Sequence, residues 1–167
     1  TCLFRYINLT IEGLSDAEPD SFEIEIIATH VNQEEPEDGP YSEWITIVID
    51  ETYGVELELL GGVNTVDGNG SVDWNSYTTY LVRVKNTGND EDDVTLELND
   101  YEWESSISPE GASGDSDEYI IDNLDAFESV IVQIRVSTVG ENVEFGEHDN
   151  LTLTATSGNN EEITVGM

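Results

Sequence analysis

The chain has very few basic residues: 4 Lys plus Arg stand against 38 Asp plus Glu among 167 residues, for a formal net charge of -34. Such a charge repels the phosphate backbone of nucleic acid and the anionic headgroups of membranes, so we expect neither as a partner. Cations are the expected companions, either as concentrated salt or as bound Ca²⁺ or Mg²⁺. Salt at about 1 M shortens the Debye length to about 3 Å and screens self-repulsion. The composition is typical of a salt-adapted (halophilic) or cell-surface protein.

Cysteine and long apolar runs are also scarce. Cys2 is the single cysteine, so no disulfide can close within the chain. No apolar run is long enough to cross a bilayer, and we expect no membrane insertion in this segment. The chain does not open on a basic and apolar export signal, which leads us to expect a mature or an internal piece of a protein, with its compartment to be argued from other features.

Catalytic signatures are missing as well. His30 and His148 are the only histidines, and no Cys or His lies at the spacing of a zinc set. No serine lies in the context of a nucleophile elbow, and no carboxylate pair stands out among so many acids. We therefore predict that the chain is not an enzyme and requires no cofactor, with Ca²⁺ left open as a ligand.

Short runs with period-two alternation fill the sequence, and Gly, Asn, Asp and Pro separate them. Their β-branched and aromatic residues are typical of strands, whereas a disordered acidic tail lacks them. No window has the 3.6-residue stripe of a helix. The runs predict an all-β sandwich of about ten strands, with Val84, Ile134 and Val136 on inner faces. The runs are residues 3–13, 21–30, 41–51, 53–62, 77–86, 93–100, 117–124, 128–138, 150–157 and 161–167.

The sequence repeats itself at a shift of 127 residues. Two pairs of segments then superpose without a gap, namely residues 130–140 on 3–13 and residues 151–158 on 24–31. Gly140 meets Gly13, and Ala155 meets Ala28. Alternation alone explains matching apolar positions, but it does not explain these matches of small residues, so the register indicates an internal repeat.

The repeat predicts two unequal parts. Residues 1–52 match only the closing strands of a module, and residues 53–167 form one near-complete sandwich module. A half-sandwich exposes an apolar face and unpaired strand edges to solvent, so we expect other strands to cover that face and pair with those edges. Either other strands of a longer protein or strand addition by a neighbouring subunit would supply it. The predicted inner face of the partial module includes Leu3, Ile7, Leu9, Phe22, Ile24 and Ile26.

The segment YLVRVKNTGNDEDDVTLEL (80–98) resembles the B-turn-C segment of immunoglobulin-like modules of the cell-adhesion-related (CARDB-like) type, which recur in tandem on archaeal and bacterial surface proteins. FESVIVQIRV and GEHDNLTLTATS resemble their later strands. The resemblance covers residues 75–167 well and 1–50 in part, and implies an immunoglobulin-like β-sandwich that acts as a spacer, adhesive or assembly unit. It rests on Val84, Asn86, Thr87, Gly88, Asn89, Asp93, Val94 and Leu96.

The acidic turn within this segment has two interpretations. We expect Gly88 to take a positive φ, and Asn86 and Asn89 to bond the local backbone as in Asx turns. The acids are either part of a solvated corner or ligands of Ca²⁺. The candidate ligands are Asp90, Asp92 and Asp93.

A second loop, DGNGSVDWN (67–75), places oxygen-bearing side chains at every second position, as Ca²⁺ loops do. An EF-hand is excluded, because Val72 stands at the sixth position and Thr78 at the twelfth. A looser Ca²⁺ site or a plain Gly-rich loop both remain open. The candidate ligands are Asp67, Asn69, Ser71 and Asp73.

Tryptophans and glycosylation sequons complete the candidates. Trp74 lies near a loop and is the candidate glycan contact, whereas we expect Trp103 to pack in the core. The sequons begin at Asn8, Asn69 and Asn150, and glycans there are plausible in an exported protein. We expect Asn8 to point outward, because its neighbours Ile7 and Leu9 would then point inward.

The sequence as a whole predicts a structural or assembly module of an extracellular tandem-repeat protein, either a cell-surface or a filament protein, archaeal and salt-adapted. Its partners are other copies of itself or neighbouring modules of the same protein, joined in one version by strand addition between subunits. The alternative is a Ca²⁺-dependent adhesive module or a glycan-binding module.

Overall fold

The computed structural model describes residues 7–13, 17–28, 41–63, 65–66, 69–161 and 164–167. The chain forms two compact units, Thr1–Asp50 and Glu51–Met167. Every regular element in the described residues is a β-strand, which confirms the predicted all-β class. The same residues contain no helix of the length and hydropathy needed to cross a membrane.

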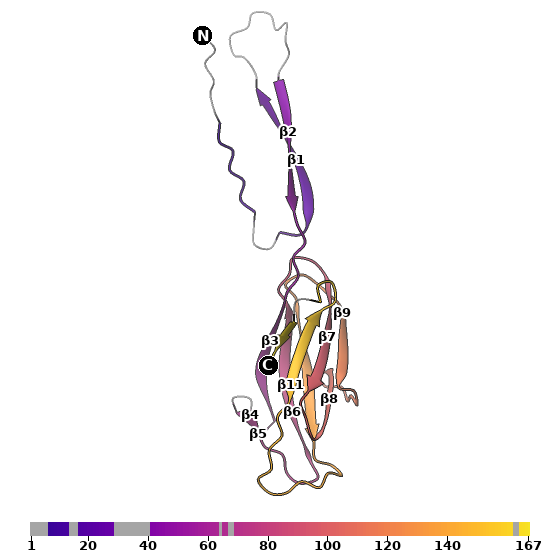
Figure 1. The fold of residues 1–167 in the computed structure, drawn as a ribbon. Coiled ribbons are helices and arrows are strands. Elements are labelled where there is room, and N and C mark those ends of the chain that lie inside the picture. The colour runs from indigo at the N-terminus through magenta and orange to yellow at the C-terminus, as the bar shows by residue number, and fades with distance from the viewer. Residues whose placement is uncertain (1–6, 14–16, 29–40, 64, 67–68, 162–163) are drawn as a thin grey trace, which may run out of the picture. The chain divides into compact units, whose positions relative to one another are not determined.

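Two four-stranded antiparallel sheets make up Glu51–Met167, here called the module (Figure 1). In spatial order they match the ABED and GFC sheets of an immunoglobulin-type sandwich, with β3 as strand A and β9 added beside strand C. The first sheet has the order β3 (Val55–Val63), β6 (Tyr77–Asn86), β10 (Ser129–Ser137) and β8 (Glu104–Pro109); the second has β12 (Thr164–Gly166), β11 (Thr152–Ser157), β7 (Asp92–Asn99) and β9 (Glu118–Leu124).

An apolar core joins the two sheets. Its side chains come from alternate positions of both, as expected when strands bury one face. Val84, Ile134 and Val136 are 0%, 3% and 5% exposed, so their predicted inward positions are confirmed. Trp103 is half-buried and packs against this core, as expected. The buried apolar residues are Val55, Val82, Val84, Val94, Leu96, Leu98, Ile107, Ile121, Leu124, Val132, Ile134, Val136, Leu153 and Ala155.

Strand β3 changes register in its second half. A bulge lies between Leu59 and Gly61, and Gly61 takes a φ of 110°, which suits a residue without a side chain. Beyond it, a Cβ on Gly62 would lie 1.9 Å from the carbonyl oxygen of Thr79, so β3 can stay paired with β6 only with glycine there. Two short strands follow, β4 (Thr65–Val66) and β5 (Asn69–Gly70), which pair with each other.

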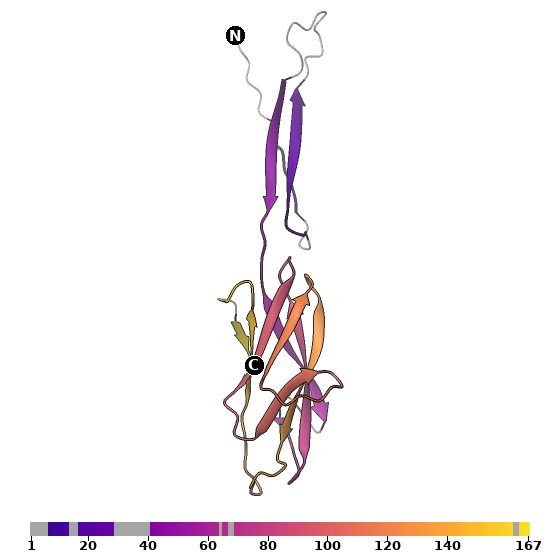
Figure 2. The same ribbon diagram turned by 90° about the vertical axis from the view of Figure 1, so that its right-hand side faces the viewer.

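The described part of Thr1–Asp50 contains one antiparallel hairpin, β1 (Asp20–Ala28) with β2 (Tyr41–Ile49), seen as two adjacent strands in Figure 2. Its cross-strand pairs, such as Ile24 opposite Ile45, sort the side chains onto two faces. One face is apolar except for Asp20 and Glu43, and none of its side chains is buried. This "hairpin face" comprises Asp20, Phe22, Ile24, Ile26, Ala28, Tyr41, Glu43, Ile45, Ile47 and Ile49.

The hairpin pairs its strands in the way that β11 and β12 do. Ala28 lies opposite Tyr41, and Ala155 lies opposite Val165. Ala28 precedes Ala155 by 127 positions and Tyr41 precedes Val165 by 124, so the connection is three residues longer in the hairpin. The repeated segments therefore have the same pairing partner and the same direction in both units.

Residues 7–13 were expected to continue a strand with inward Ile7 and Leu9, and this prediction is wrong. The segment has no regular structure, and Ile7 is 91% exposed. Its counterpart in the module is β10, which needs both β6 and β8 as neighbours. The described residues of Thr1–Asp50 supply neither neighbour, so the backbone has no ladder to join. Asn8 is exposed, but so are its neighbours, and alternation is not the reason.

Candidate functional site

The acidic turn between β6 and β7 is organised by Asn86, which is fully buried. Its side-chain nitrogen donates to the carbonyl oxygens of Asp90 at 2.8 Å and Leu124 at 2.9 Å. Its side-chain oxygen accepts from the N–H of Gly88 at 2.8 Å. One amide thus satisfies three backbone groups and ties the turn to the end of β9.

Asn89 ties the same turn to the start of the module. Its side-chain oxygen accepts from the N–H of Thr52 at 2.7 Å and from the Thr52 hydroxyl at 3.0 Å, and its own N–H donates to Thr52 O at 3.0 Å. The expected backbone bonding by both asparagines is confirmed. The expected positive φ at Gly88 is wrong. Glycine is needed there because a Cβ would lie 2.2 Å from the Thr52 carbonyl oxygen.

The three carboxylates of the turn bond three different backbone N–H groups. Asp90 accepts from Glu91 at 3.0 Å, Asp93 from Asn123 at 2.7 Å, and Asp92 from Asn159 at 3.1 Å. Asp92 is 1% exposed, and its second oxygen is buried without a hydrogen-bond partner among the described residues. Each of these three candidate Ca²⁺ ligands therefore has a structural partner in the corner.

The second candidate loop is only partly described. Asp67 lies outside the described residues, whereas Asn69, Ser71 and Asp73 are exposed. The described residues contain no group of three or more His, Cys, Asp and Glu side chains able to hold a metal ion. His148 is exposed, and His30 lies outside the described residues.

The other surface candidates lie in accessible positions. Trp74 is 76% exposed, and Asn69 and Asn150 are exposed. Trp44 is 60% exposed and lies on the side of the hairpin opposite the hairpin face. Accessibility satisfies the first requirement of a glycan contact or a glycosylation site.

The basic residues of the module all lie on the first sheet. Arg83 forms an ion pair with Glu58 of β3. The guanidinium of Arg135 lies 4.1 Å from the ring centre of Tyr77, a cation–π contact. Lys85 pairs in register with Glu56. Each of these cations thus lies near an acid or an aromatic ring, and Arg5 lies outside the described residues.

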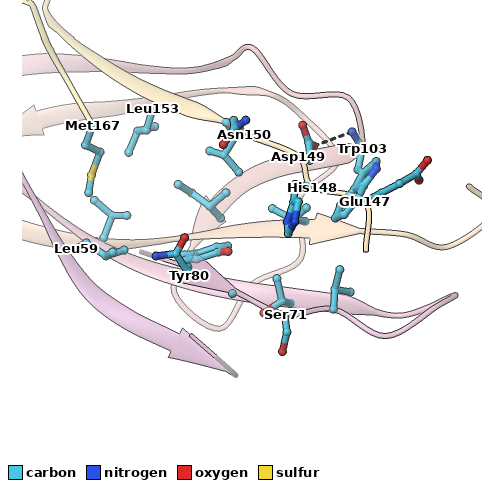
Figure 3. Close-up of a pocket in the computed structure, with 18 residues that line it drawn as sticks. Leu59, Ser71, Tyr80, Trp103, Glu147, His148, Asp149, Asn150, Leu153 and Met167 are labelled. Atoms are coloured by element: carbon cyan, nitrogen blue, oxygen red, sulfur yellow. Dashed lines mark hydrogen bonds between the residues drawn. The ribbon is translucent and has the colours of Figure 1, made fainter. Parts of the chain in front are cut away.

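The module contains a cleft of about 580 Å³ lined by both sheets. Figure 3 shows Leu153 and Met167 on one side of it and Leu59 and Tyr80 on the other. The sequence did not single out this cleft. Its lining comprises Leu59, Asn69, Gly70, Ser71, Val72, Thr78, Tyr80, Val82, Trp103, Ile134, Val136, Glu147, His148, Asp149, Asn150, Leu151, Leu153 and Met167.

The polar end of the cleft is built by Asp149. Its two carboxylate oxygens accept from the N–H groups of Glu102 and Trp103, each at 2.9 Å (Figure 3 draws the second bond). This pair of bonds fixes the loop before β8 and positions Trp103 at the end of the cleft. Glu147, His148 and Asn150 are exposed at the rim beside it.

No family model matches the chain, and no curated protein matches it. The fold, the hairpin face and the cleft are therefore the features that bear on function.

Proposed function

We propose that the chain is a non-enzymatic structural and assembly module of an extracellular tandem-repeat protein, on a cell surface or in a filament, of the CARDB-like immunoglobulin type. Its net charge of -34 suits a salt-adapted, archaeal setting. Its partners are other copies of itself or neighbouring modules of the same protein. The function is mechanical: modules pack strand against strand and build an extended array.

The hairpin face carries this proposal. At the shift of 127 residues, Ile26 and Ala28 correspond to Leu153 and Ala155, which are 1% and 0% exposed in the module. Ile26 is itself 41% exposed. The same positions of the same repeat are thus core in one unit and surface in the other, which is the pattern of an interface.

Energetics favour a cover for this face. Full burial of one large aliphatic or aromatic side chain stabilises by about 1.5–3 kcal/mol, and the hairpin face holds several. An isolated two-stranded hairpin is at best marginally stable in water, because nothing offsets its lost conformational entropy. Packing against another β-sheet supplies that burial.

The contact proposed here is heterologous, because it pairs the hairpin face with opening strands, which the described residues of Thr1–Asp50 do not contain. In Glu51–Met167 the equivalent positions, Leu153 and Ala155, are covered by the first sheet of the same module. A contact of this kind repeats from subunit to subunit and builds a fibre instead of a closed dimer.

The test is an assembly experiment in molar NaCl, with light scattering and electron microscopy as readouts. The full chain is compared with Glu51–Met167 alone, a compact unit with its own core. We expect fibres or large oligomers from the full chain only. Equal assembly by both chains would show that residues 1–50 do not drive association and would refute the proposal.

A further inference from the structure

The ladder between β3 and β6 continues beyond the first residue of β3. The N–H of Thr87 donates to the carbonyl oxygen of Gly54 at 2.8 Å, and the N–H of Asn89 donates to that of Thr52 at 3.0 Å. Both pairs keep the register of the first half of β3. Residues 52–54, here called the entry segment, are therefore held along the acidic turn as a strand would be.

The side chain of Asn89 completes the outermost pair of this ladder. In an antiparallel ladder, a hydrogen-bonded pair exchanges two N–H···O bonds. One of them runs from Asn89 to the Thr52 carbonyl; the other runs from the Thr52 N–H to the side-chain oxygen of Asn89, at 2.7 Å. The Thr52 hydroxyl donates to the same oxygen at 3.0 Å. Both backbone polar groups of Thr52 are thus bound by one residue.

Two glycines bring the entry segment and the turn into close contact. A Cβ on Gly54 would lie 2.4 Å from the hydroxyl oxygen of Thr87, and a Cβ on Gly88 would lie 2.2 Å from the carbonyl oxygen of Thr52. The two backbones therefore touch without a side chain between them, which keeps the hydrogen bonds short and shielded.

Asn86 anchors the turn to both sheets. Its N–H donates at 3.0 Å to the carbonyl oxygen of Glu128, just before β10, and its side chain donates to that of Leu124 at the end of β9. Strand β6 lies between β3 and β10, whereas β3 is at the edge of its sheet. Tension from the preceding chain reaches the module at this edge strand, and the turn connects it to interior strands.

We propose that residues 86–89 form a clamp that holds the entry segment against tension along the chain. Hydrogen bonds of an antiparallel ladder lie perpendicular to its strands, so a pull along the strand axis strains all of them together. Strand β3 then stays paired with β6 until the clamp opens. That neighbouring modules transmit such tension rests on the function proposed above, whereas the clamp itself acts within one chain.

The experiment pulls single full-length chains at constant force. Cys2 is the single cysteine and takes one handle, and the exposed position of Glu141→Cys takes the other. Glu141 follows β10 at the end of the sandwich opposite the clamp, because Ser137 of β10 pairs with Tyr77 at the start of β6. The pull therefore enters through the entry segment and runs along the strands.

Asn89→Ala removes two bonds to Thr52, so we expect the module to unfold at least about tenfold faster at the same force. Thr52→Val removes the hydroxyl bond alone and should speed unfolding about threefold, which keeps the test available if Asn89→Ala does not fold. Asn159→Ala is the matched control. It removes a side-chain bond to Glu91 outside the entry segment and should change the rate by less than about twofold.

A second comparison separates resistance to force from overall stability. Ile134→Ala opens a cavity in the core and leaves the clamp intact, so it should unfold at lower denaturant than Asn89→Ala and yet survive longer under force. The same order of the two variants in both measurements, or equal rates for Asn89→Ala and Asn159→Ala under force, would overturn the proposal. These readouts come from single chains, so failure of the clamp and failure of the assembly function are distinguishable.

Discussion

Leu153 and Met167 exchange two backbone hydrogen bonds, each 3.0 Å long, across the second sheet of the module. Leu153 is 1% exposed, whereas Met167 is 43% exposed. The ladder is thus in register at a point where one side chain is core and its partner is half uncovered. In the hairpin the equivalent ladder runs on to Ile49, and no side chain of the hairpin face is buried. The same strand pairing is therefore part of a core in the module and exposed in the hairpin.

The assignment of inner and outer faces predicts different stability losses for substitutions at two isoleucines. Ile134→Ala should lower the free energy of unfolding by about 2–5 kcal/mol, because the side chain is 3% exposed and its removal leaves a cavity. Ile120→Ala removes the same atoms at a site that is 48% exposed and should cost less than about 1 kcal/mol. Denaturant unfolding measures both. Equal losses would contradict the assignment of inner and outer faces.

The stability of the acidic turn should depend on the side-chain amide of Asn86 and not on the charge of the acids in the turn. Asn86→Ala removes three hydrogen bonds and leaves buried backbone groups unpaired, so we expect a loss of about 2–4 kcal/mol in the free energy of unfolding. Glu91→Gln changes an exposed acid of the same turn and should alter it by less than about 0.5 kcal/mol. A larger effect of the charge change would mean that the acids organise the turn.

Salt should stabilise the fold. With 38 acids against 4 bases, repulsion between carboxylates opposes the compact state, and NaCl screens it as the Debye length falls from about 10 Å at 0.1 M to about 3 Å at 1 M. We expect the melting temperature to rise steadily over this range by several degrees. A melting curve that is the same at low and high NaCl would contradict the salt-adapted account.

The phenol of Tyr53 should lose its proton at a higher pH than an ordinary tyrosine does. Its hydroxyl donates to Glu51 at 2.8 Å, and this bond, with the nearby acids, raises the pKa of Tyr53 to about 12. A raised pKa favours the protonated phenol in the folded state, so this contribution is complete below pH 10 and is lost as the pH approaches 12. Tyrosinate absorbance during a pH titration should show the late group, and Glu51→Ala should bring its pKa back toward 10. A titration curve unchanged by Glu51→Ala would rule out this cause.

Alternation was sufficient to predict most of the sandwich, because β6, β7, β10 and β11 bury side chains at alternate positions. It failed for β8, which is buried through Ser105, Ser106 and Ser108 around a single Ile107. Small hydroxyl side chains fit beside β10 without an apolar pattern, so the sequence carries no period-two signal there. It also failed for residues 7–13, where the pattern is present and the neighbouring strands are not.

The candidate sites could also be predicted from the sequence only in part. The roles of Asn86 and Asn89 follow from their turn chemistry and could be predicted. The reason for Gly88 could not, because it is a close approach of Thr52, a residue 36 positions earlier in the chain. The cleft could not be predicted either, since it lies between β3, β6 and β10 of one sheet and β11 of the other, which are far apart in the sequence.

The hairpin face gives the most direct test of the assembly function. Two double variants differ only in which side of the hairpin they change. Ile24→Ser with Ile45→Ser removes apolar side chains from the hairpin face, whereas Trp44→Ser with Val48→Ser removes them from the opposite side. Ile24 and Ile45 are cross-strand neighbours, and Trp44 and Val48 lie on the same strand. All four side chains are at least partly exposed, so neither variant opens a cavity.

The measurement is sedimentation velocity of the full chain and both variants in molar NaCl, over a range of protein concentrations. The account predicts that the wild-type chain and the Trp44→Ser, Val48→Ser variant associate as concentration rises, and that the Ile24→Ser, Ile45→Ser variant remains a monomer. A wild-type chain that stays monomeric at every concentration, or two variants that associate to the same extent, would contradict it.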